Sequence, residues 1–309
     1  MEKLKENLPL RYIVRIIAFF AITMLLINII PPTDAISVNP FSQPEGIRTV
    51  SASGGGAALP DNVMLSFNTA ASSYGVMTFS IGVVMTADEK LVVADYDELS
   101  VYTSQTGRIS EKTLEELSLL NFAHNFTADN GLSYQYRNQV LKCIEINDLF
   151  GSYPYTDYII NIVQTGQEGI RAAVLLCEAI RVNDLSLRVV IKGSDEVVRS
   201  AREETNVHIL TEPCGLELQS FEGFHNLGLG NLYLKMKFQY LEIDVDNLGK
   251  YSKRMLAALQ KRNVCIYVSG VETIEDYQRA KAVNADGIIT DYPEAVLEFI
   301  AVDASDLPQ

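Results

Sequence analysis

This sequence of 309 residues holds few side chains suited to nucleophilic, acid–base or metal chemistry. Its three histidines, His124, His208 and His225, lie far apart in the chain. Its four cysteines are equally scattered, with no CxxC pair and no Cys/His spacing typical of zinc. The sequence therefore contains no compact motif for a zinc centre or a disulfide framework.

Two charged residues at the ends of apolar runs are the candidate ligand-binding residues. Asp95 follows the run LVVA, and Lys192 ends the run LRVVIK. The carboxylate of Asp95 is able to act as a base, and the ammonium of Lys192 is able to hold an anion, but solvated residues at the rim of a domain have the same pattern. The run Gly54-Gly55-Gly56 fits either a phosphate cradle or a loop without a ligand, and no lysine follows it as in a P-loop.

The charge balance restricts the class of partner. Lys and Arg total 25 and Asp and Glu total 39, so the formal net charge is −14, while 48% of the residues are hydrophobic. The chain has enough apolar residues for a large core, and its negative field disfavours nucleic acids and loose attraction to anionic lipids. We expect no nucleic-acid partner.

The N-terminal region has the pattern of a membrane segment. Residues 12–30 (YIVRIIAFFAITMLLINII) are long enough as a helix to cross the hydrocarbon layer, and Pro31 and Pro32 end the run. Lys and Arg lie before and within the start of this run and are absent after it until Arg48, which places the N-terminus in the cytoplasm and the remainder outside. A signal peptide cleaved near Ala35 is the alternative.

These observations give the expected domain organisation. Residues 1–11 form a cytoplasmic N-terminus, 12–30 a transmembrane anchor, 31–47 a linker with four prolines, 48–301 a folded domain and 302–309 a tail. The expected location is the cell membrane, with the folded domain on the extracytoplasmic side.

Short apolar runs alternate with helical patterns through the folded domain. The pattern predicts a TIM-type (β/α)8 barrel, and a doubly wound sheet is the alternative. The link around residues 88–90 is too short for a parallel crossover, so it predicts one antiparallel hairpin. Asp61 is the expected N-cap of the first barrel helix. The predicted strands are 48–52, 76–84, 91–95, 158–163, 187–192, 207–211, 238–244, 264–269 and 286–290. The predicted helices are 61–74, 111–120, 167–182, 195–204, 250–262, 272–284 and 293–300.

Several stretches resemble one enzyme family. Residues 84–117 (VMTADEKLVVADYDELSVYTSQTGRISEKTLEEL) resemble, without a gap, a stretch of the glycerophosphodiester phosphodiesterases. Pro60-Asp61-Asn62 is similar to their Pro-Glu-Asn-Thr motif, and residues 286–300 (DGIITDYPEAVLEFI) are similar to their last strand and helix. The resemblance covers most of residues 48–300 and implies a barrel of the phosphodiesterase kind.

The resemblance also implies where catalytic residues belong, and this chain lacks them. The family's His-Arg after the first strand corresponds to Ala52 and Ser53, and its later His-Asp corresponds to Asp95 and Tyr96. No histidine falls on either position. Both proton-transfer groups that the family uses are therefore replaced.

The metal-binding positions are replaced in the same way. The family's Glu-x-Asp corresponds to Ser80 and Gly82, and the carboxylate of its fourth strand corresponds to Val163. Ca²⁺ and Mg²⁺ require several oxygen ligands, and these three residues offer one neutral hydroxyl. No metal site and no cofactor are expected, and Ca²⁺ or Mg²⁺ enters only if the domain is active.

Three functions remain after this comparison. The preferred one is a membrane-anchored pseudoenzyme that binds a small anionic ligand or a protein partner. The first alternative is an active phosphodiester hydrolase of lipid metabolism with a rewired site that uses Asp95, Asp97 and Asp129. The second alternative is a purely structural or interaction module.

Overall fold

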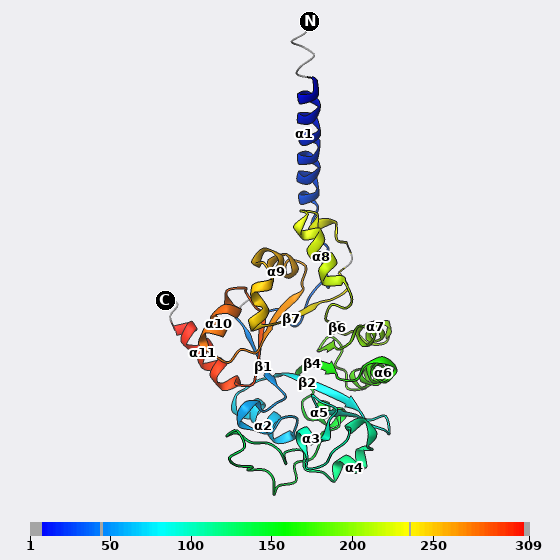
Figure 1. Ribbon diagram of the computed structural model, residues 1–309, viewed down its shortest axis with the longest axis vertical. Coiled ribbons are helices and arrows are strands. Elements are labelled where there is room, and N and C mark those ends of the chain that lie inside the picture. Colours follow the sequence, from blue (N-terminus) through cyan, green and yellow to red (C-terminus); the bar gives the residue numbers. More distant parts are fainter. Residues whose placement is uncertain (1–7, 44–45, 235, 306–309) are drawn as a thin grey trace.

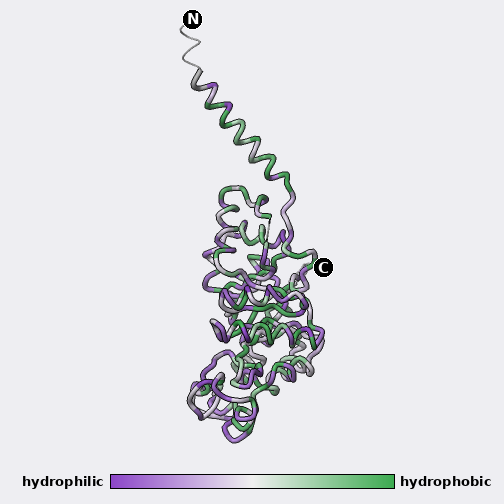
Figure 2. The backbone as a smooth tube through the Cα atoms, turned by 90° about the vertical axis from the view of Figure 1, so that its right-hand side faces the viewer, coloured by the Kyte–Doolittle hydropathy of each residue, from purple (hydrophilic) through white to green (hydrophobic). Residues whose placement is uncertain are grey.

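The chain forms one apolar helix followed by a barrel (Figure 1). The computed structural model describes residues 8–43, 46–234 and 236–305. Helix α1 (Leu8–Ile29) extends away from the barrel, and Figure 2 shows its largely apolar character. Its segment Arg11–Ile29 is long and apolar enough to cross a membrane, and none of it is buried against the barrel. A membrane span and a signal sequence both fit this helix.

Eight parallel strands form the barrel wall. They are β1 (Arg48–Ala52), β2 (Thr78–Met85), β4 (Asp157–Ile162), β5 (Val189–Lys192), β6 (Leu210–Thr211), β7 (Tyr240–Asp244), β8 (Cys265–Ser269) and β9 (Gly287–Thr290). Their order is β6-β5-β4-β2-β1-β9-β8-β7, and β3 (Leu91–Val93) pairs antiparallel with β2. The predicted barrel and hairpin are confirmed, and the doubly wound alternative is wrong.

The barrel is nearly closed between β6 and β7. The backbone N–H of Gln239 donates to the carbonyl oxygen of Thr211 at 3.1 Å, and its side-chain oxygen accepts from the N–H of Thr211 at 3.2 Å. One glutamine thus supplies most of the polar contact that a longer β6 would provide. Because β6 has only two residues, the predicted strand 207–211 is too long.

Helices surround the wall, and every predicted one is present. They are α2 (Met64–Ser73), α4 (Leu114–Ser118), α6 (Gly166–Val182), α7 (Asp195–Glu203), α9 (Lys253–Gln260), α10 (Ile274–Lys281) and α11 (Pro293–Ser305). The sequence reading missed α3 (Leu99–Tyr102), α5 (Ile146–Ser152) and α8 (Glu217–Asn226), which are short or lack a strong apolar stripe. Helix α11 includes part of the segment expected to be a tail. Four 3-10 helices complete the elements of the described residues: η2 (Gly56–Ala58), η3 (Ile109–Glu111), η4 (Gly230–Leu232) and η5 (Val245–Lys250).

In the part of the chain that the structure describes, the 3-10 helices are the four named, and they occupy connections rather than the wall. The helix η2 follows β1, η5 follows β7, η3 precedes α4 and η4 follows α8. Helices of this kind are common in short connecting pieces, and here they bring the chain from one strand end to the next element.

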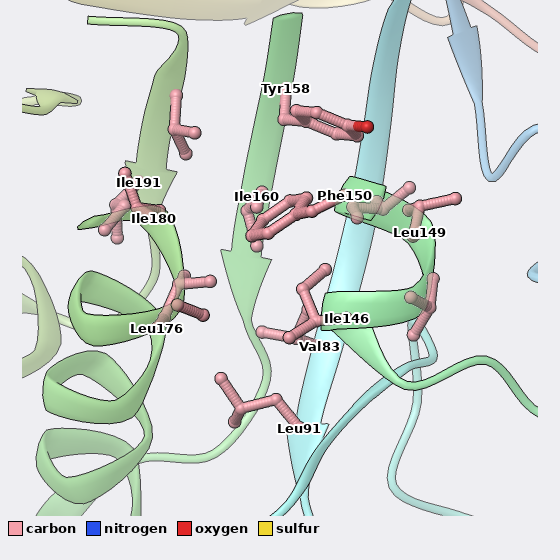
Figure 3. Close-up of a cluster of buried hydrophobic side chains, with 14 of the residues drawn as sticks. Val83, Leu91, Ile146, Leu149, Phe150, Tyr158, Ile160, Leu176, Ile180 and Ile191 are labelled. Atoms are coloured by element: carbon pink, nitrogen blue, oxygen red, sulfur yellow. The ribbon is translucent and has the colours of Figure 1, made fainter. Parts of the chain in front are cut away.

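The core has an inner and an outer layer. Alternate residues of the strands, such as Val50, Ile159 and Tyr240, fill the barrel interior. The residues between them face outward toward the helices. Figure 3 shows part of this outer layer, where Phe150 of α5 packs on Tyr158 of β4 with the ring centroids 4.9 Å apart.

The segment 31–47, expected to be a linker, is attached to the barrel over its described residues. Phe41 is fully buried at the lower end of the barrel interior, where its carbonyl oxygen accepts from the Tyr267 hydroxyl at 2.9 Å. The Asn39 side chain donates to the carbonyl oxygens of Gln239 and Asn263. This segment therefore contributes Phe41 to the core, which its four prolines and lack of hydrophobic periodicity do not indicate.

We expect Phe41→Ala to lower the free energy of unfolding by about 3–5 kcal/mol, since it leaves a cavity at the base of the barrel. Val38→Ala is the matched control: Val38 is 72% exposed, and its truncation should change stability by less than about 0.5 kcal/mol. Denaturant unfolding of the full chain in detergent measures both. Equal effects of the two substitutions would contradict the attachment.

Candidate functional site

The carboxyl ends of the strands form the mouth of the barrel, the end where sites gather in this type of fold. Strand alternation decides which side chains face the mouth. Phe79, Ile81 and Val83 of β2 belong to the outer layer, so Ser80 and Gly82 face the barrel axis. By the same rule Ala52, Asn161, Lys192 and Glu242 face the axis from β1, β4, β5 and β7.

Asp95, directly after β3, is the most connected side chain of the mouth. Its Oδ2 accepts from the Ser53 hydroxyl at 2.6 Å and from the Asn62 side-chain amide at 2.7 Å. Its Oδ1 accepts from the backbone N–H of Gly82 at 2.7 Å. Three donors from three different segments therefore fix this carboxylate, which is typical of a structural acceptor.

The backbone around Asp95 adapts to these bonds. Ser53 and Asn62 both have positive φ, at 51° and 59°, and the Asn62 N–H donates to the Ser53 carbonyl oxygen at 2.8 Å. The backbone N–H groups of Asp95 and Tyr96 both donate to the Tyr102 hydroxyl. Burial raises the pKa of Tyr102, so this hydroxyl stays neutral. The Tyr96 side chain itself is 61% exposed.

Gly82 has no room for a side chain. A Cβ there would lie 2.4 Å from the Ala94 carbonyl oxygen, 2.6 Å from Asp95 Cα and 2.9 Å from Asp95 Oδ1. The Asp95 segment occupies the space that a carboxylate at position 82 would need. The absence of a metal-ligating side chain at this position is thus built into the packing of the mouth.

The other replaced positions are also part of the framework. Val163 packs against the cluster beneath the β2–β3 hairpin, and its N–H donates to the Val83 carbonyl oxygen. Gly54 lies against Phe67, since a Cβ there would be 2.6 Å from the ring, and a Cβ at Gly55 would be 2.9 Å from the Ser66 side chain. Close packing of this loop on α2 therefore accounts for the first two glycines without a phosphate.

Lys192, the second candidate, is already paired. Its Nζ lies 2.5 Å from Glu242 Oε2, and the Tyr240 hydroxyl donates to the same oxygen at 2.9 Å. Each side chain of the ion pair is 18% exposed. Burial raises the pKa of the neighbouring Glu212, whose Oε1 accepts from the Gly193 N–H. An anion at Lys192 would have to displace Glu242 or approach two carboxyl groups.

Acidic groups dominate the opposite side of the mouth. The rim loops around Asp61 partly desolvate its carboxyl group, and this effect, together with the charges of Asp95 and Asp291, raises its pKa to about 7. The residue is nevertheless exposed at the surface. Burial and the charges of Glu272 and Asp95 also raise the pKa of Asp291. A cavity of about 500 Å³ opens beside them, lined by Gly55, Ala57, Asp291, Tyr292 and Glu294 among others.

The side chains proposed for a rewired metal site do not meet. Asp97 binds Arg108 and Ser110, and Asp129 binds Thr127 and Ser133, so both stabilise their own loops. Among residues 8–43, 46–234 and 236–305, no three His, Cys, Asp or Glu side chains are placed to hold one metal ion. The donors present at the mouth therefore do not fit the divalent cation that the resemblance implies.

The histidines lie outside these contacts. His124 is in the loop after α4, the exposed His208 precedes β6, and His225 is on α8. His208 lies outside the barrel core because β6 begins only at Leu210.

Sequence reasoning missed two residues of the mouth. Asp61 was expected to cap α2, but that helix begins at Met64 after Val63 and leaves Asp61 in the turn above the mouth. Asn62 was noted only as part of a motif, and it proves to be a donor to Asp95. The sequence signal for Asn62 was its residue type, since Asn is enriched at positions with left-handed backbone, and Asn62 has such a backbone here.

Known proteins resemble this chain in sequence and in fold. No family model matches the chain. A curated glycerophosphodiester phosphodiesterase of Caldanaerobacter subterraneus is 23% identical over 253 residues, which is 78% of this chain and 93% of that protein. The glycerophosphoryl diester phosphodiesterase domain of a Mycobacterium tuberculosis protein superposes with a TM-score of 0.69 at 15% identity, covering 82% of this chain and 99% of that domain.

A phosphodiesterase of Oleispira antarctica, solved with the product sn-glycerol-3-phosphate, gives a TM-score of 0.64 at 15% identity over 82% of this chain and 96% of its own. The barrel has the glycerophosphodiester phosphodiesterase fold. Identities of this size establish the fold, while the chemistry has to be argued from the side chains of the mouth. At the mouth of this barrel, the Asp95 carboxylate accepts hydrogen bonds from Ser53, Asn62 and the Gly82 N–H.

We expect Gly82→Ala to destabilise the barrel by about 1–3 kcal/mol, because its methyl group would overlap the Ala94 carbonyl oxygen and Asp95. Gly151→Ala is the matched control: Gly151 lies in α5 with nothing within 4 Å of its Cβ position, and alanine there should stabilise by roughly 0.5–1 kcal/mol. Denaturant unfolding of the two variants provides the comparison. A neutral Gly82→Ala would show that the mouth has space for a side chain.

The raised pKa of Asp61 predicts a pH-dependent stability. The folded state holds this proton up to about pH 7, whereas the unfolded chain releases it near the ordinary value of 3.8, so the carboxyl destabilises the fold increasingly as pH rises through this window. Asp61→Asn should therefore raise the melting temperature at pH 8 and change it little at pH 4. The same difference at both pH values would contradict this expectation.

Proposed function

We propose that this chain is a membrane-tethered, glycerophosphodiester phosphodiesterase-like barrel that has lost metal-dependent hydrolysis and serves as a binding module. The observation that carries the proposal is the Asp95 carboxylate, held by Ser53, Asn62 and Gly82 where the family has a catalytic histidine. These donors occupy three of the roughly four acceptor positions of the carboxylate, which leaves little of it available to take a proton from a substrate. The proposal therefore gives Asp95 a structural role.

The electrostatics of the mouth support the loss of hydrolysis. A phosphodiester carries a negative charge, and the rim presents Asp61, Asp95 and Asp291 on one side. Lys192, which faces the axis, is neutralised by Glu242. With neither metal ligands nor a free cation to offset these carboxylates, binding and transition-state stabilisation of a phosphodiester are both opposed.

The mouth is suited to a different class of ligand. Its excess of carboxyl groups and the adjoining cavity of about 500 Å³ favour a neutral polyol or a cationic group over a free phosphate. This proposal replaces the expectation of a small anionic ligand. A thermal-shift comparison of glycerol, choline and glycerol 3-phosphate distinguishes these classes, and stabilisation by glycerol 3-phosphate alone would favour the anion.

The contacts of the segment after α1 support an uncleaved anchor. Thr33 and Ala35, the small residues at which a signal peptidase would cut, are both bound to Arg262. The Arg262 guanidinium donates to the Thr33 carbonyl oxygen at 3.0 Å, and the Ala35 N–H donates to the Arg262 carbonyl oxygen at 2.7 Å. Cleavage at Ala35 would remove contacts that complete the folded domain.

The activity assay tests the loss of hydrolysis. We expect no metal-dependent turnover of glycerophosphocholine or glycerophosphoglycerol by the full-length protein with Ca²⁺, Mg²⁺, Mn²⁺ or Zn²⁺. The Caldanaerobacter relative, assayed in parallel, is the positive control. Turnover that disappears in Asp95→Ala would overturn the proposal in favour of a rewired hydrolase, and turnover that survives it would assign catalysis to other residues.

The distribution of basic residues predicts the side of the membrane. Since Lys3, Lys5, Arg11 and Arg15 precede or open the apolar run, the barrel should lie outside the cytoplasm. Protease added to intact protoplasts should digest the barrel, while a cytoplasmic marker protein stays intact. Protection of the barrel until the membrane is opened would reverse the assignment.

A further inference from the structure

The end of the barrel nearest α1 contains a segment in direct contact with that helix. The side-chain amide of Asn231, in η4, donates to the carbonyl oxygens of Ile27 and Asn28 at 3.5 Å. The last carbonyls of a helix have no intrahelical donor, so Asn231 supplies one. Figure 1 shows α8 directly beside the barrel end of α1.

This contact reaches into the apolar part of α1. The Cβ position of Gly228 lies 3.8 Å from Met24 Sδ. Met24 precedes the end of the apolar segment at Ile29 by five residues, which corresponds to about 7 Å along the helix axis. If α1 spans a membrane, the loop after α8 lies at the depth where interfacial helices bury their apolar faces, about 5–10 Å below the surface.

The composition of this loop suits that depth. Residues 223–234 (GFHNLGLGNLYL) contain no Asp, Glu, Lys or Arg, in a chain of which 21% is charged. Four large apolar side chains are nevertheless exposed: Phe224 by 41%, Leu227 by 67%, Leu232 by 37% and Leu234 by 61%. We call these four residues the α8–η4 surface. An exposed apolar group without charges is unusual beside water and typical of a contact with lipid or protein.

A buried arginine connects the α8–η4 surface to the rest of the chain. The buried Arg262 donates to the carbonyl oxygens of Gly230 and Thr33, so it joins η4 to the segment that leaves α1. Its guanidinium also lies 5.5 Å from the centre of the Phe221 ring. Burial, with the charges of Arg254 and Arg262, lowers the pKa of His225, which favours its neutral form.

The charges next to this surface match a membrane with anionic lipids. Lys250, Lys253, Arg254 and Lys261 in and around α9 are exposed, and none has an ion-pair partner among the described residues. Residues 247–271 contain no Asp or Glu, although the chain carries a net charge of −14. Asp34, near Arg262, is an acidic residue at the same end. Figure 1 shows α9 beside α8, so the basic residues border the apolar ones.

We propose that the α8–η4 surface inserts into the outer interfacial layer of the bilayer that α1 spans, while the basic residues around α9 face anionic lipid headgroups. This inference rests on the proposed role of α1 as an anchor. It gives the barrel a second membrane contact and therefore a fixed orientation. The segment after α1 joins the barrel at the amino ends of β8 and β9, so the mouth opens at the other end, toward the aqueous phase.

The chain has no tryptophan, which permits a direct test with single-tryptophan variants. Leu227→Trp reports on the proposed surface, Phe20→Trp on the anchor and Tyr96→Trp on the barrel mouth. The full-length variants are reconstituted in phosphatidylcholine–phosphatidylglycerol vesicles with and without brominated acyl chains, which quench nearby tryptophan. We expect Leu227→Trp and Phe20→Trp to lose most of their fluorescence and to emit at shorter wavelength, and Tyr96→Trp to remain unquenched.

The outcomes separate this inference from the proposed anchor. Quenching of Phe20→Trp without quenching of Leu227→Trp would overturn the second contact and leave the anchor in place. Absence of quenching at both positions would overturn both. Blue-shifted emission of Leu227→Trp that requires a high protein-to-lipid ratio would assign the surface to a second copy of the chain instead of lipid.

Charge-reversal variants test the role of the basic residues around α9. In Leu227→Trp, the added substitutions Lys253→Glu and Arg254→Glu should reduce quenching in vesicles that contain phosphatidylglycerol and change it little in phosphatidylcholine alone. Both side chains are exposed, so the barrel should remain folded, which circular dichroism verifies. Equal quenching with and without the two substitutions in anionic vesicles would remove the basic residues from the proposal.

Discussion

The hydrogen bonds of the Asp95 carboxylate hold together the loops from which the barrel mouth is built. They join the loop after β1 through Ser53, the entry to α2 through Asn62 and strand β2 through the Gly82 N–H. A buried or half-buried carboxylate requires such donors, because an unpaired one is costly to remove from water. The need to satisfy this group therefore constrains the backbone of three segments at once, including Ser53 and Asn62, which both have positive φ.

The wall of the barrel and the side chains at its mouth are stabilised by different sets of contacts. In a barrel the strands and the outer helices carry the packing, so residues at the mouth can change while the wall remains. Here the changes are mutually dependent: Gly82 provides the space that the Asp95 segment fills, and Lys192 has Glu242 as its partner. A carboxylate side chain at position 82 would collide with the backbone of Ala94 and Asp95, directly after β3.

The opposite end of the barrel is organised by another buried charge. Arg262, 2% exposed, donates to carbonyl oxygens of Thr33 and Gly230 and thereby joins the end of α1 to the connection between β6 and β7. Burial lowers the pKa of this guanidinium, and the Asp34 charge opposes that effect. The proline-rich stretch after α1 is thus attached to the barrel through Arg262 over the described residues.

The sequence by itself determined the apolar helix, the order of the strands and helices, and the β2–β3 hairpin, because hydrophobic periodicity and connection length are local properties of the chain. The resemblance also predicted that Ser80, Gly82, Asp95 and Val163 occupy the family's site positions, and this prediction needed no coordinates. Only the tertiary structure decided what these residues contact. The partners of Asp95 are 13 to 42 positions away, and Phe41 reaches the barrel core from a stretch that looks like a linker. Contacts of this kind depend on how distant segments close on one another, and no local pattern in the chain encodes them.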